Sequence, residues 1–388
     1  MTGLPGQRHS RLTVSRRARA AALVLCFGIL VAVTAAKTDD APAPFVVPAG
    51  RTKPAPEPTV EVVGSVPRAE RPAAWTALAA RAIDDTTLPA EGVTVPPGAN
   101  VFAARIVDGG SSPAYMMFEA GGGAFSTAFY PASSIKVLAT AGALERAYAS
   151  GFTGHAIVDG GYSLADYYDG AIRSSSNEDY DELVRIAGVD WLNEDFLPAR
   201  GYLSTRIQDA YAEGDSVAES PPVELSEHGD ELTLPERESR EDYGCEAANC
   251  STLIELVDSV RRVVLDGELP AEERFAVDPD DIAGMQDALL GAESWIGPGV
   301  TEALGAGATV YSKPGWTSGD DCVDVGLVAD HQTGDRYLIG VSAPDDGECA
   351  MLATMAAEVL TVLSHHADGQ AVRTDGTSVR VVDGRAVP

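Results

Sequence analysis

The sequence has 388 residues, of which 45% are hydrophobic and 22% are charged, enough for one large domain or two closely packed ones. Its formal net charge is -30 at pH 7 and its pI is about 4.4. A field of that sign repels phosphate, which argues against nucleic acids and anionic membranes as partners. Solubility is the simpler interpretation of the acidity.

Residues 1–36 have the composition of an export signal. Several arginines precede an uncharged apolar run over residues 20–36, and this run ends in small residues. The run is long for a cleaved signal and short for a membrane-spanning helix. A cleaved signal peptide and a single uncleaved N-terminal membrane anchor therefore both stay open. In either case we expect export, to the cell envelope or beyond it.

The next segments set the order of the predicted elements. Residues 37–71 are rich in Pro and Ala without periodicity, which predicts an extended tether, and the folded part begins near Pro72. A helix is expected at 73–82, and two apolar stretches separated by Asp108-Gly109-Gly110-Ser111 predict a β-hairpin. In chain order we expect strands at 101–107 and 115–119, helices at 133–149, 177–187, 191–199, 252–265 and 279–290, strands at 309–312, 323–328 and 337–342, and a helix at 349–363.

Strands at both ends of the folded part, with helices between them, predict an α+β fold in which distant segments complete one sheet. We place the sheet domain at residues 72–132 and 300–366 and an inserted helical domain at 133–299. Within the insert, residues 213–249 are acidic and weakly patterned, which predicts a long loop or lid. Residues 367–388 carry no packing signal and are expected to be a disordered tail.

Cysteine usage agrees with export. Apart from Cys26 in the apolar run, an even number of cysteines remains, and they allow three pairings. We favour Cys245 with Cys250 as a local staple, and Cys322 with Cys349 as a tie to the last helix. A zinc site is the rival interpretation, but no histidine lies near either pair at zinc-finger spacing. We therefore expect disulfides, and neither a metal nor another cofactor.

Lysine is scarce, because only Lys37, Lys53, Lys136 and Lys313 occur and the first two lie in the tether. A buried Lys can have its pKa lowered until it acts as a base, which Arg cannot do. Lys136 follows Ser133 by three residues at a helix start, so the two side chains share a face. The free N–H groups there favour an oxyanion. The alternative interpretation is a helix-capping Ser with a snorkelling Lys.

Two further motifs follow in order. Ser175-Ser176-Asn177 opens a helical stretch, and Lys313-Pro314-Gly315 ends a strand-like one. Alone, the first is an ordinary helix cap and the second an ordinary turn. Together with Ser133 and Lys136 they follow the order Ser-x-x-Lys, Ser-Asp-Asn and Lys-Thr-Gly of serine acyl-transferases. Three weak signals in this order, each on the expected element, predict a nucleophilic serine site.

The segments 131–136, 171–177 and 311–316 resemble the three motifs of class A β-lactamases and their penicillin-binding relatives. In element order the resemblance covers roughly residues 72–366. It implies an antiparallel sheet flanked by helices on both faces, an inserted all-helical domain and an active site between the two.

The resemblance also implies roles. Ser133 is expected to be the nucleophile, Lys136 its base, and Ser175 the relay of a proton to the leaving group. Backbone N–H groups of Ser133 and Trp316 are expected to form the oxyanion hole. The substrate-binding residues that the resemblance implies are Asn177, Lys313, Gly315, Trp316 and Thr317.

The sequence departs from this family at two places. The family has a hydroxyl residue after the third-motif Lys, whereas Pro314 has neither a hydroxyl nor an N–H, and Thr317 or Ser318 would have to replace it. The family also carries a Glu-x-x-Leu-Asn run whose Glu activates the deacylating water. No such run occurs here. Glu213 is nearest by position, with Val217 where the Asn should stand.

We therefore hold two functional hypotheses. The first is a monomeric serine hydrolase that acts through an acyl-enzyme on a small-molecule β-lactam or a peptidoglycan peptide. The second is a catalytically weakened penicillin-binding or peptidoglycan-sensing protein. A Ser-His-Asp esterase with His155, His228 or His331 as base ranks last, because no Gly-x-Ser-x-Gly run surrounds any serine.

Overall fold

The computed structural model describes residues 62–65, 93–110, 112–121, 123–124, 127–212, 216–239, 242–317, 321–344, 349–366, 369–373, 377–383 and 385–387. The chain divides into two units, Met1–Glu57 and Pro58–Pro388, and all described residues belong to the second. The predicted signal or anchor segment, most of the tether and the helix expected at 73–82 lie outside the described residues. Among the residues that are described, no helix is long and apolar enough to span a membrane.

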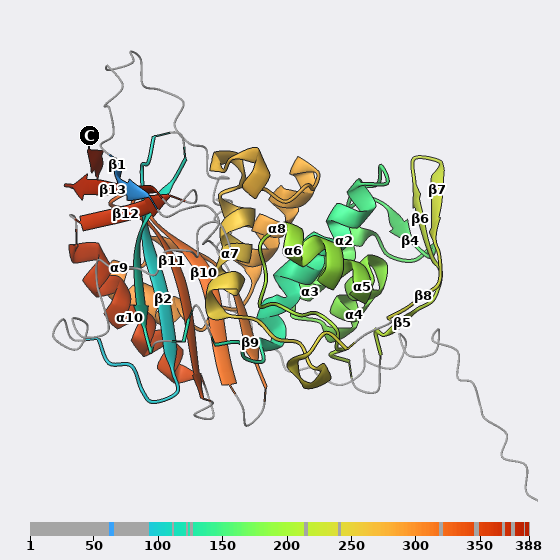
Figure 1. The fold of residues 1–388 in the computed structure, drawn as a ribbon, viewed down its shortest axis with the longest axis horizontal. Helices are drawn as coiled ribbons and strands as arrows, with labels where there is room; N and C mark the ends of the chain where they lie inside the picture. The colour runs from blue at the N-terminus through green and yellow to red at the C-terminus, as the bar shows by residue number, and fades with distance from the viewer. Residues whose placement is uncertain are drawn as a thin grey trace, which may run out of the picture. The chain divides into compact units, whose positions relative to one another are not determined.

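Strands from both ends of the second unit form one antiparallel sheet (Figure 1). Its order is β1-β13-β12-β3-β2-β11-β10-β9, and β14 pairs with β13. All of these neighbours run antiparallel. The strands are β1 Val62–Ser65, β2 Asn100–Val107, β3 Ala114–Ala120, β9 Ala308–Trp316, β10 Asp321–Asp330, β11 Arg336–Pro344, β12 Gly369–Arg373, β13 Thr377–Val382 and β14 Arg385–Val387.

Strand β2 explains why this sheet has a covering layer on each side. Successive side chains of a strand point to opposite faces. Phe102 and Ala104 accordingly belong to one hydrophobic core, while Val101 and Ala103 belong to another. Because all four are buried, neither face of the strand can be left to solvent.

Helices supply those two layers. Helix α7 (Leu253–Val264) packs on one face, and α9 (Gly297–Leu304) with α10 (Ala350–His365) packs on the other (Figure 1). The predicted antiparallel sheet with helices on both faces is therefore confirmed.

The helices between the two sets of strands pack around α2 (Lys136–Tyr148), nearly every residue of which is buried, as its apolar sequence predicts. Gly142 lets a neighbour approach closely, because a Cβ there would lie 2.4 Å from Leu192 Cδ2. The other helices and helical turns are η3 Ala132–Ile135, α3 Leu164–Ile172, α4 Asn177–Ala187, α5 Val189–Trp191, the π-helical turn η4 Leu192–Phe196, α6 Leu197–Ala199, η5 Cys245–Ala247, η6 Asp266–Glu268, η7 Ala271–Glu273 and α8 Pro279–Gly291.

The inserted region is not all-helical, contrary to expectation, because the acidic segment 213–249 carries strands. These form a hairpin that also pairs with β4, and a separate pair, β5 with β8. Val223 and Leu225 alternate with polar residues and are buried, which is the period of a half-buried strand. His228 and Gly229 both have positive φ in the two-residue turn. The strands are β4 Ile157–Val158, β5 Glu219–Ser220, β6 Val223–Glu227, β7 Asp230–Leu234 and β8 Arg237–Glu238.

The C-terminal residues also differ from the expected tail. Strands β12, β13 and β14 extend the sheet, and Val372 pairs with Tyr115 of β3. Strand β1, which falls in the predicted tether, pairs with β13. The sequences of these strands are short and contain few apolar residues apart from valines. They form strands because the edge of the existing sheet offers free backbone groups with which they can pair.

The favoured disulfide pairing is confirmed. Cys245 pairs with Cys250, and Cys322 at the start of β10 pairs with Cys349 at the start of α10. Two disulfides are typical of proteins in an oxidising compartment and are compatible with export.

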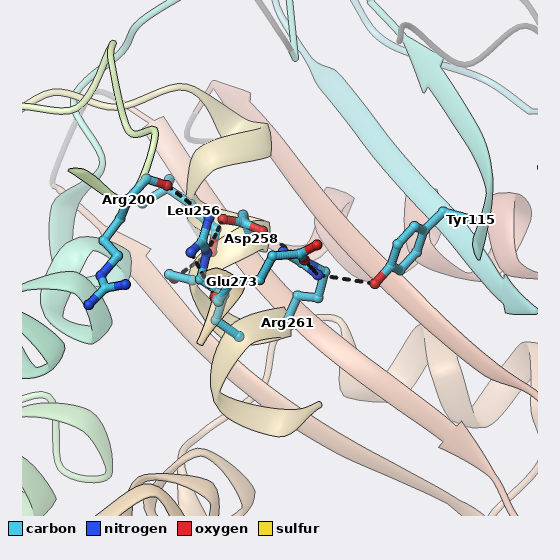
Figure 2. Close-up of polar contacts among 8 residues, drawn as sticks. Tyr115, Arg200, Leu256, Asp258, Arg261 and Glu273 are labelled. Carbon is cyan, nitrogen blue, oxygen red and sulfur yellow. Dashed lines mark hydrogen bonds and ion pairs between the residues drawn. The ribbon is translucent and has the colours of Figure 1, made fainter. Parts of the chain in front are cut away.

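A buried ionic network joins α7 to its surroundings (Figure 2). The guanidinium of Arg261 pairs with Asp258 at 2.7 Å and with Glu273 at 2.9 Å, and donates to the Tyr115 hydroxyl of β3 at 3.1 Å. Arg262 pairs with the other oxygen of Asp258 at 2.7 Å. Burial alone raises the pKa of Asp258, but the two guanidiniums outweigh it and hold this pKa below its ordinary value.

Candidate active site

Ser133 lies where the turn η3 runs into α2, and strand β9 presses against its backbone. A Cβ at Gly315 of β9 would lie 2.9 Å from Ser133 N and 2.6 Å from Pro131 O. Only glycine permits that approach. Ala132, just before the serine, has φ 44, a left-handed conformation that costs free energy in a non-glycine residue. The half-buried Ser133 therefore sits on a constrained turn beside β9 and lines a cleft.

Lys136 is fully buried at the start of α2 and is held by three acceptors. Its Nζ donates to Ser175 O at 2.6 Å, to Ser176 O at 3.1 Å and to Asn177 Oδ1 at 2.7 Å. None of these acceptors is a carboxylate. Burial, and secondly the charge of Lys313, lower the pKa of Lys136 to about 7. The neutral form of the amine is therefore accessible near neutral pH.

Ser175 connects the two lysines of the site. Its carbonyl accepts from Lys136, and its hydroxyl accepts from Lys313 Nζ at 2.8 Å. This bifunctional contact depends on an uncommon backbone conformation, since Ser175 has φ 56. The next residue, Ser176, caps α4 by accepting from Asp179 N at 3.1 Å. The second motif is thus both a helix cap and the link between two cations.

Lys313 is buried on β9, and a buried carboxylate, Asp324, lies on the neighbouring strand β10. Burial lowers the pKa of Lys313 to about 8, although Asp324 opposes the effect. Asp324 lies on β10 opposite Pro314 and accepts from the backbone N of Trp295 at 2.8 Å and of Ile296 at 3.0 Å. Burial raises the pKa of Asp324 to about 7. Lys313 is therefore largely protonated at neutral pH, and backbone donors hold the Asp324 carboxyl in place.

The aromatic ring of Tyr211 lies beside the amine of Lys136, a contact that the sequence did not predict. Its ring stacks on Tyr180 at 4.5 Å, and both ring centroids lie within 5.9 Å of Lys136 Nζ. Its hydroxyl donates to Ala132 O at 2.8 Å, and its carbonyl accepts from Asn177 Nδ2 at 3.0 Å. A tyrosine in a polar segment gives no signal of such a position. Glu213, the expected counterpart of the family's loop Glu, lies outside the described residues.

The cleft above Ser133 has a volume of about 200 Å³. Thr317 follows the strand but is not among the described residues that line it. Trp316 is 50% exposed at its edge. Arg173, Ser174, Glu293 and Trp295 also line the cleft, although the sequence motifs give none of them a role. The lining consists of Ser133, Arg173, Ser174, Ser175, Glu293, Trp295, Lys313, Pro314, Gly315 and Trp316.

The structure thus connects seven of the eight predicted site residues. Five of them line one cleft, and Lys136, which binds both Ser175 and Asn177, joins the other two to it. A scan against protein-family models finds no match, and neither does a sequence search of the curated proteins.

Comparison with solved structures identifies the fold. A β-lactamase from Burkholderia vietnamiensis matches with a TM-score of 0.51 and 17% identity, over 74% of this chain and 98% of that one. TLA-1 extended-spectrum β-lactamase matches with 0.50 and 13% identity, over 72% and 97%. A single-residue mutant of the class A β-lactamase of the last common ancestor of Gram-negative bacteria matches with 0.50 and 16% identity, over 72% and 97%.

The chain has the class A β-lactamase fold. The three motifs predicted this fold from the sequence, and the structure confirms it. At these identities the likeness concerns the arrangement of the chain. The chemistry of a site on this β-lactamase fold depends on the side chains that this chain places there.

Proposed function

We propose that this protein is a serine hydrolase that forms an acyl-enzyme at Ser133 with β-lactams or related cell-wall peptides. One observation carries the proposal: the buried Lys136, whose pKa is lowered to about 7, and the buried Lys313 both bind Ser175, which lines the same cleft as Ser133. A helix-capping Ser with a snorkelling Lys would instead place the amine in solvent.

In the proposed acylation, Ser133 Oγ attacks the carbonyl carbon of the substrate amide and passes its proton to the neutral amine of Lys136. The resulting ammonium is stabilised by the carbonyls of Ser175 and Ser176 and by Asn177 Oδ1, which already surround it. The new C–O bond replaces the C–N bond. The leaving nitrogen takes a proton from the Ser175 hydroxyl, and the ammonium of Lys136 reprotonates Ser175, so that the lysine is neutral again and the proton of Ser133 ends on the leaving group. Backbone N–H groups at the helix start stabilise the oxyanion.

The substrate that fits is an amide with a nearby carboxylate. Lys313 is protonated at neutral pH and donates to Ser175, so a negative charge bound beside that pair is favoured electrostatically. Arg173 also lines the cleft, but it is already paired with Asp169 and Asp287, so Lys313 is the principal cation there. Pro314 offers no hydroxyl there, so this charge recognition has to rest on the cations. Two disulfides support action outside the cytoplasm, where cell-wall peptides occur.

A second candidate function is a penicillin-binding protein that keeps its acyl group. The contacts of Lys136 favour it, because its acceptors are two backbone carbonyls and an amide, and the rings of Tyr180 and Tyr211 cover its other side. Among the described residues, no carboxylate accepts a hydrogen bond from Lys136, so none is seen there that could activate a hydrolytic water. Acylation is therefore better supported than fast deacylation.

Intact-mass measurement of the full chain with benzylpenicillin tests both functions. We expect a covalent mass increase equal to one whole penicillin, lost in Ser133→Ala and retained in Ser150→Ala, an exposed serine just beyond α2. A persistent adduct supports the penicillin-binding function. Rapid appearance of hydrolysed penicillin supports the β-lactamase function. Neither adduct nor hydrolysis, with benzylpenicillin and with peptide thioester probes, would refute the acyl-enzyme.

A further inference from the structure

A second cavity lies away from Ser133, among residues that the proposed reaction does not use. Its volume is about 450 Å³, more than twice that of the cleft. It opens between the last turns of α2, the junction of α4 with α5, and the strand pair β5 and β8. Arg146 and Trp191 line it from the helical side, and Ser220 and Arg237 line it from the strands.

Two guanidinium groups converge in this cavity at Gly188. A Cβ on Gly188 would lie 3.4 Å from Arg146 Nη1 and 3.4 Å from Arg237 Nε, so both groups border the same backbone position. Gly188 has φ 84, which glycine adopts without strain. Arg146 Nη1 donates to Ala187 O, and Arg237 Nη2 donates to Arg185 O at 2.5 Å. Backbone carbonyls thus hold both cations in place.

The charges of these two cations are not matched by bound carboxylates in the described part of the chain. Neither Arg146 nor Arg237 forms an ion pair with a carboxylate among the described residues, and Arg237 Nε and Nη1 are buried there without an acceptor. Burial, and secondly Arg146, lower the pKa of Arg237 to about 10. A buried charged donor without an acceptor is destabilising, and buried Arg is almost always paired. A single anionic group bound beside these two guanidiniums is therefore favoured electrostatically.

Acidic side chains surround the same cavity. Asp190 and Glu194 both lie beside the hydroxyl of Tyr243, at 3.0 Å and 2.8 Å, and its single proton can be donated to one of them at a time. A polyanion such as a polyphosphate would be repelled by this rim, whereas an ammonium group would be attracted. The carboxylates that line the cavity are Asp190, Glu194, Asp195, Glu236 and Glu238.

We propose that this cavity is a second ligand site, for a small zwitterion such as a short peptide with free ends. Its carboxylate binds between Arg146 and Arg237, and its ammonium group binds to the acidic rim. Trp191, over which Arg146 lies at 5.6 Å, and the apolar Val189 and Val217 provide the wall against which the ligand backbone packs. The proposal does not depend on the function of Ser133.

Calorimetric titration of the full chain at pH 7 tests the site with matched probes. Glycylglycine has both charges, N-acetylglycylglycine only the carboxylate, and glycylglycinamide only the ammonium group. We expect glycylglycine to bind with a dissociation constant on the order of 1 mM. Each blocked analogue should bind about tenfold more weakly, because one charge-assisted contact is lost. Equal binding of a blocked analogue, or of inorganic phosphate, would overturn the assignment to a zwitterion.

Variants locate the binding. Arg146→Gln and Arg237→Gln should each weaken glycylglycine binding about tenfold. Arg336→Gln, which alters a half-buried, ion-paired arginine on β11 that does not line the cavity, should not change it. Glu236 and Glu238 are exposed, so their Gln variants test the rim even if an arginine variant fails to fold. No binding of glycylglycine, or unchanged binding in the doubly substituted rim variant, would overturn the proposal.

Discussion

Lys136 and Lys313 bind opposite groups of one residue, because the first donates to the carbonyl of Ser175 at 2.6 Å and the second to its hydroxyl at 2.8 Å. The positive charge of Lys313 lowers the pKa of Lys136, second only to burial. The proposed base and the proposed substrate-binding cation therefore do not titrate independently. The order of their pKa values, Lys136 at about 7 and Lys313 at about 8, determines when the site is competent.

The pH dependence of acylation follows from that order. Acylation needs Lys136 neutral, so its rate constant should fall as pH drops below about 7. It also needs Lys313 charged, so the rate constant should fall again as pH rises above about 8. The second-order rate constant for penicillin labelling, followed by intact mass from about pH 5 to about pH 10, should be bell-shaped. A rate that keeps rising to the alkaline end of this range would contradict these roles.

Substitutions at Lys313 test the coupling. Lys313→Met removes a charge that lowers the pKa of Lys136, so the acidic limb of the profile should move to higher pH. Lys313→Arg keeps the charge and cannot lose it in this range. It should leave the acidic limb in place and abolish the basic limb. Identical acidic limbs in the Met and Arg variants would show that the two groups are not coupled.

The site could be predicted from the sequence because its residues belong to short, ordered motifs. Ser133 with Lys136 needs only the geometry of one helix, and Ser175 and Lys313 are recognised by their neighbours in the chain. Tyr211 and Asp324 have no such context. Each acts through contacts across distant segments, with Ala132 and with Trp295, which only the folded chain brings together.

The fold was predictable where apolar periodicity is long and uninterrupted. The helix predicted at 177–187 coincides with α4, and the strands expected at 101–107 and 115–119 lie within β2 and β3. The hairpin of β6 and β7 was missed because its few buried residues alternate with acidic ones on a mostly exposed ribbon. Strands β12 to β14 depend on an edge that the rest of the sheet supplies.

Gly315 should be essential to the approach of β9 to Ser133. In Gly315→Ala the new Cβ would meet backbone atoms, Pro131 O at 2.6 Å and Ser133 N at 2.9 Å, which cannot rotate away. The strand must shift, and a misplacement of about 1 Å can reduce the rate about 10²-fold. We also expect a loss of about 1–3 kcal/mol in the free energy of unfolding from overpacking. Labelling kinetics and urea denaturation measure the two effects.

The matched control is Gly267→Ala, where a Cβ would meet nothing within 4 Å. It should leave both the labelling rate and the urea midpoint essentially unchanged. A Gly315→Ala protein that labels like the unsubstituted chain would mean that β9 can withdraw from Ser133 without consequence for the reaction.

The buried network on α7 should dominate the acid sensitivity of the fold. Two guanidiniums hold the pKa of Asp258 below its unfolded value, so its stabilisation is present above the unfolded pKa and is lost as pH falls through the folded one. Asp258→Asn leaves Arg261 and Arg262 buried with a partner removed, which should cost about 3–5 kcal/mol at pH 7.

The same substitution should flatten the dependence of the unfolding free energy on pH below about 4, because it removes a carboxylate whose protonation destabilises the fold. Asp287→Asn is the control, since Asp287 pairs with Arg173 at the surface and such pairs contribute about 0–1 kcal/mol. Urea denaturation from about pH 3 to about pH 7 compares the two variants. If Asp258→Asn lost no more stability at neutral pH than Asp287→Asn, the network would contribute little to holding α7 against β3. A steep acid dependence retained in Asp258→Asn would assign the acid sensitivity to other carboxylates.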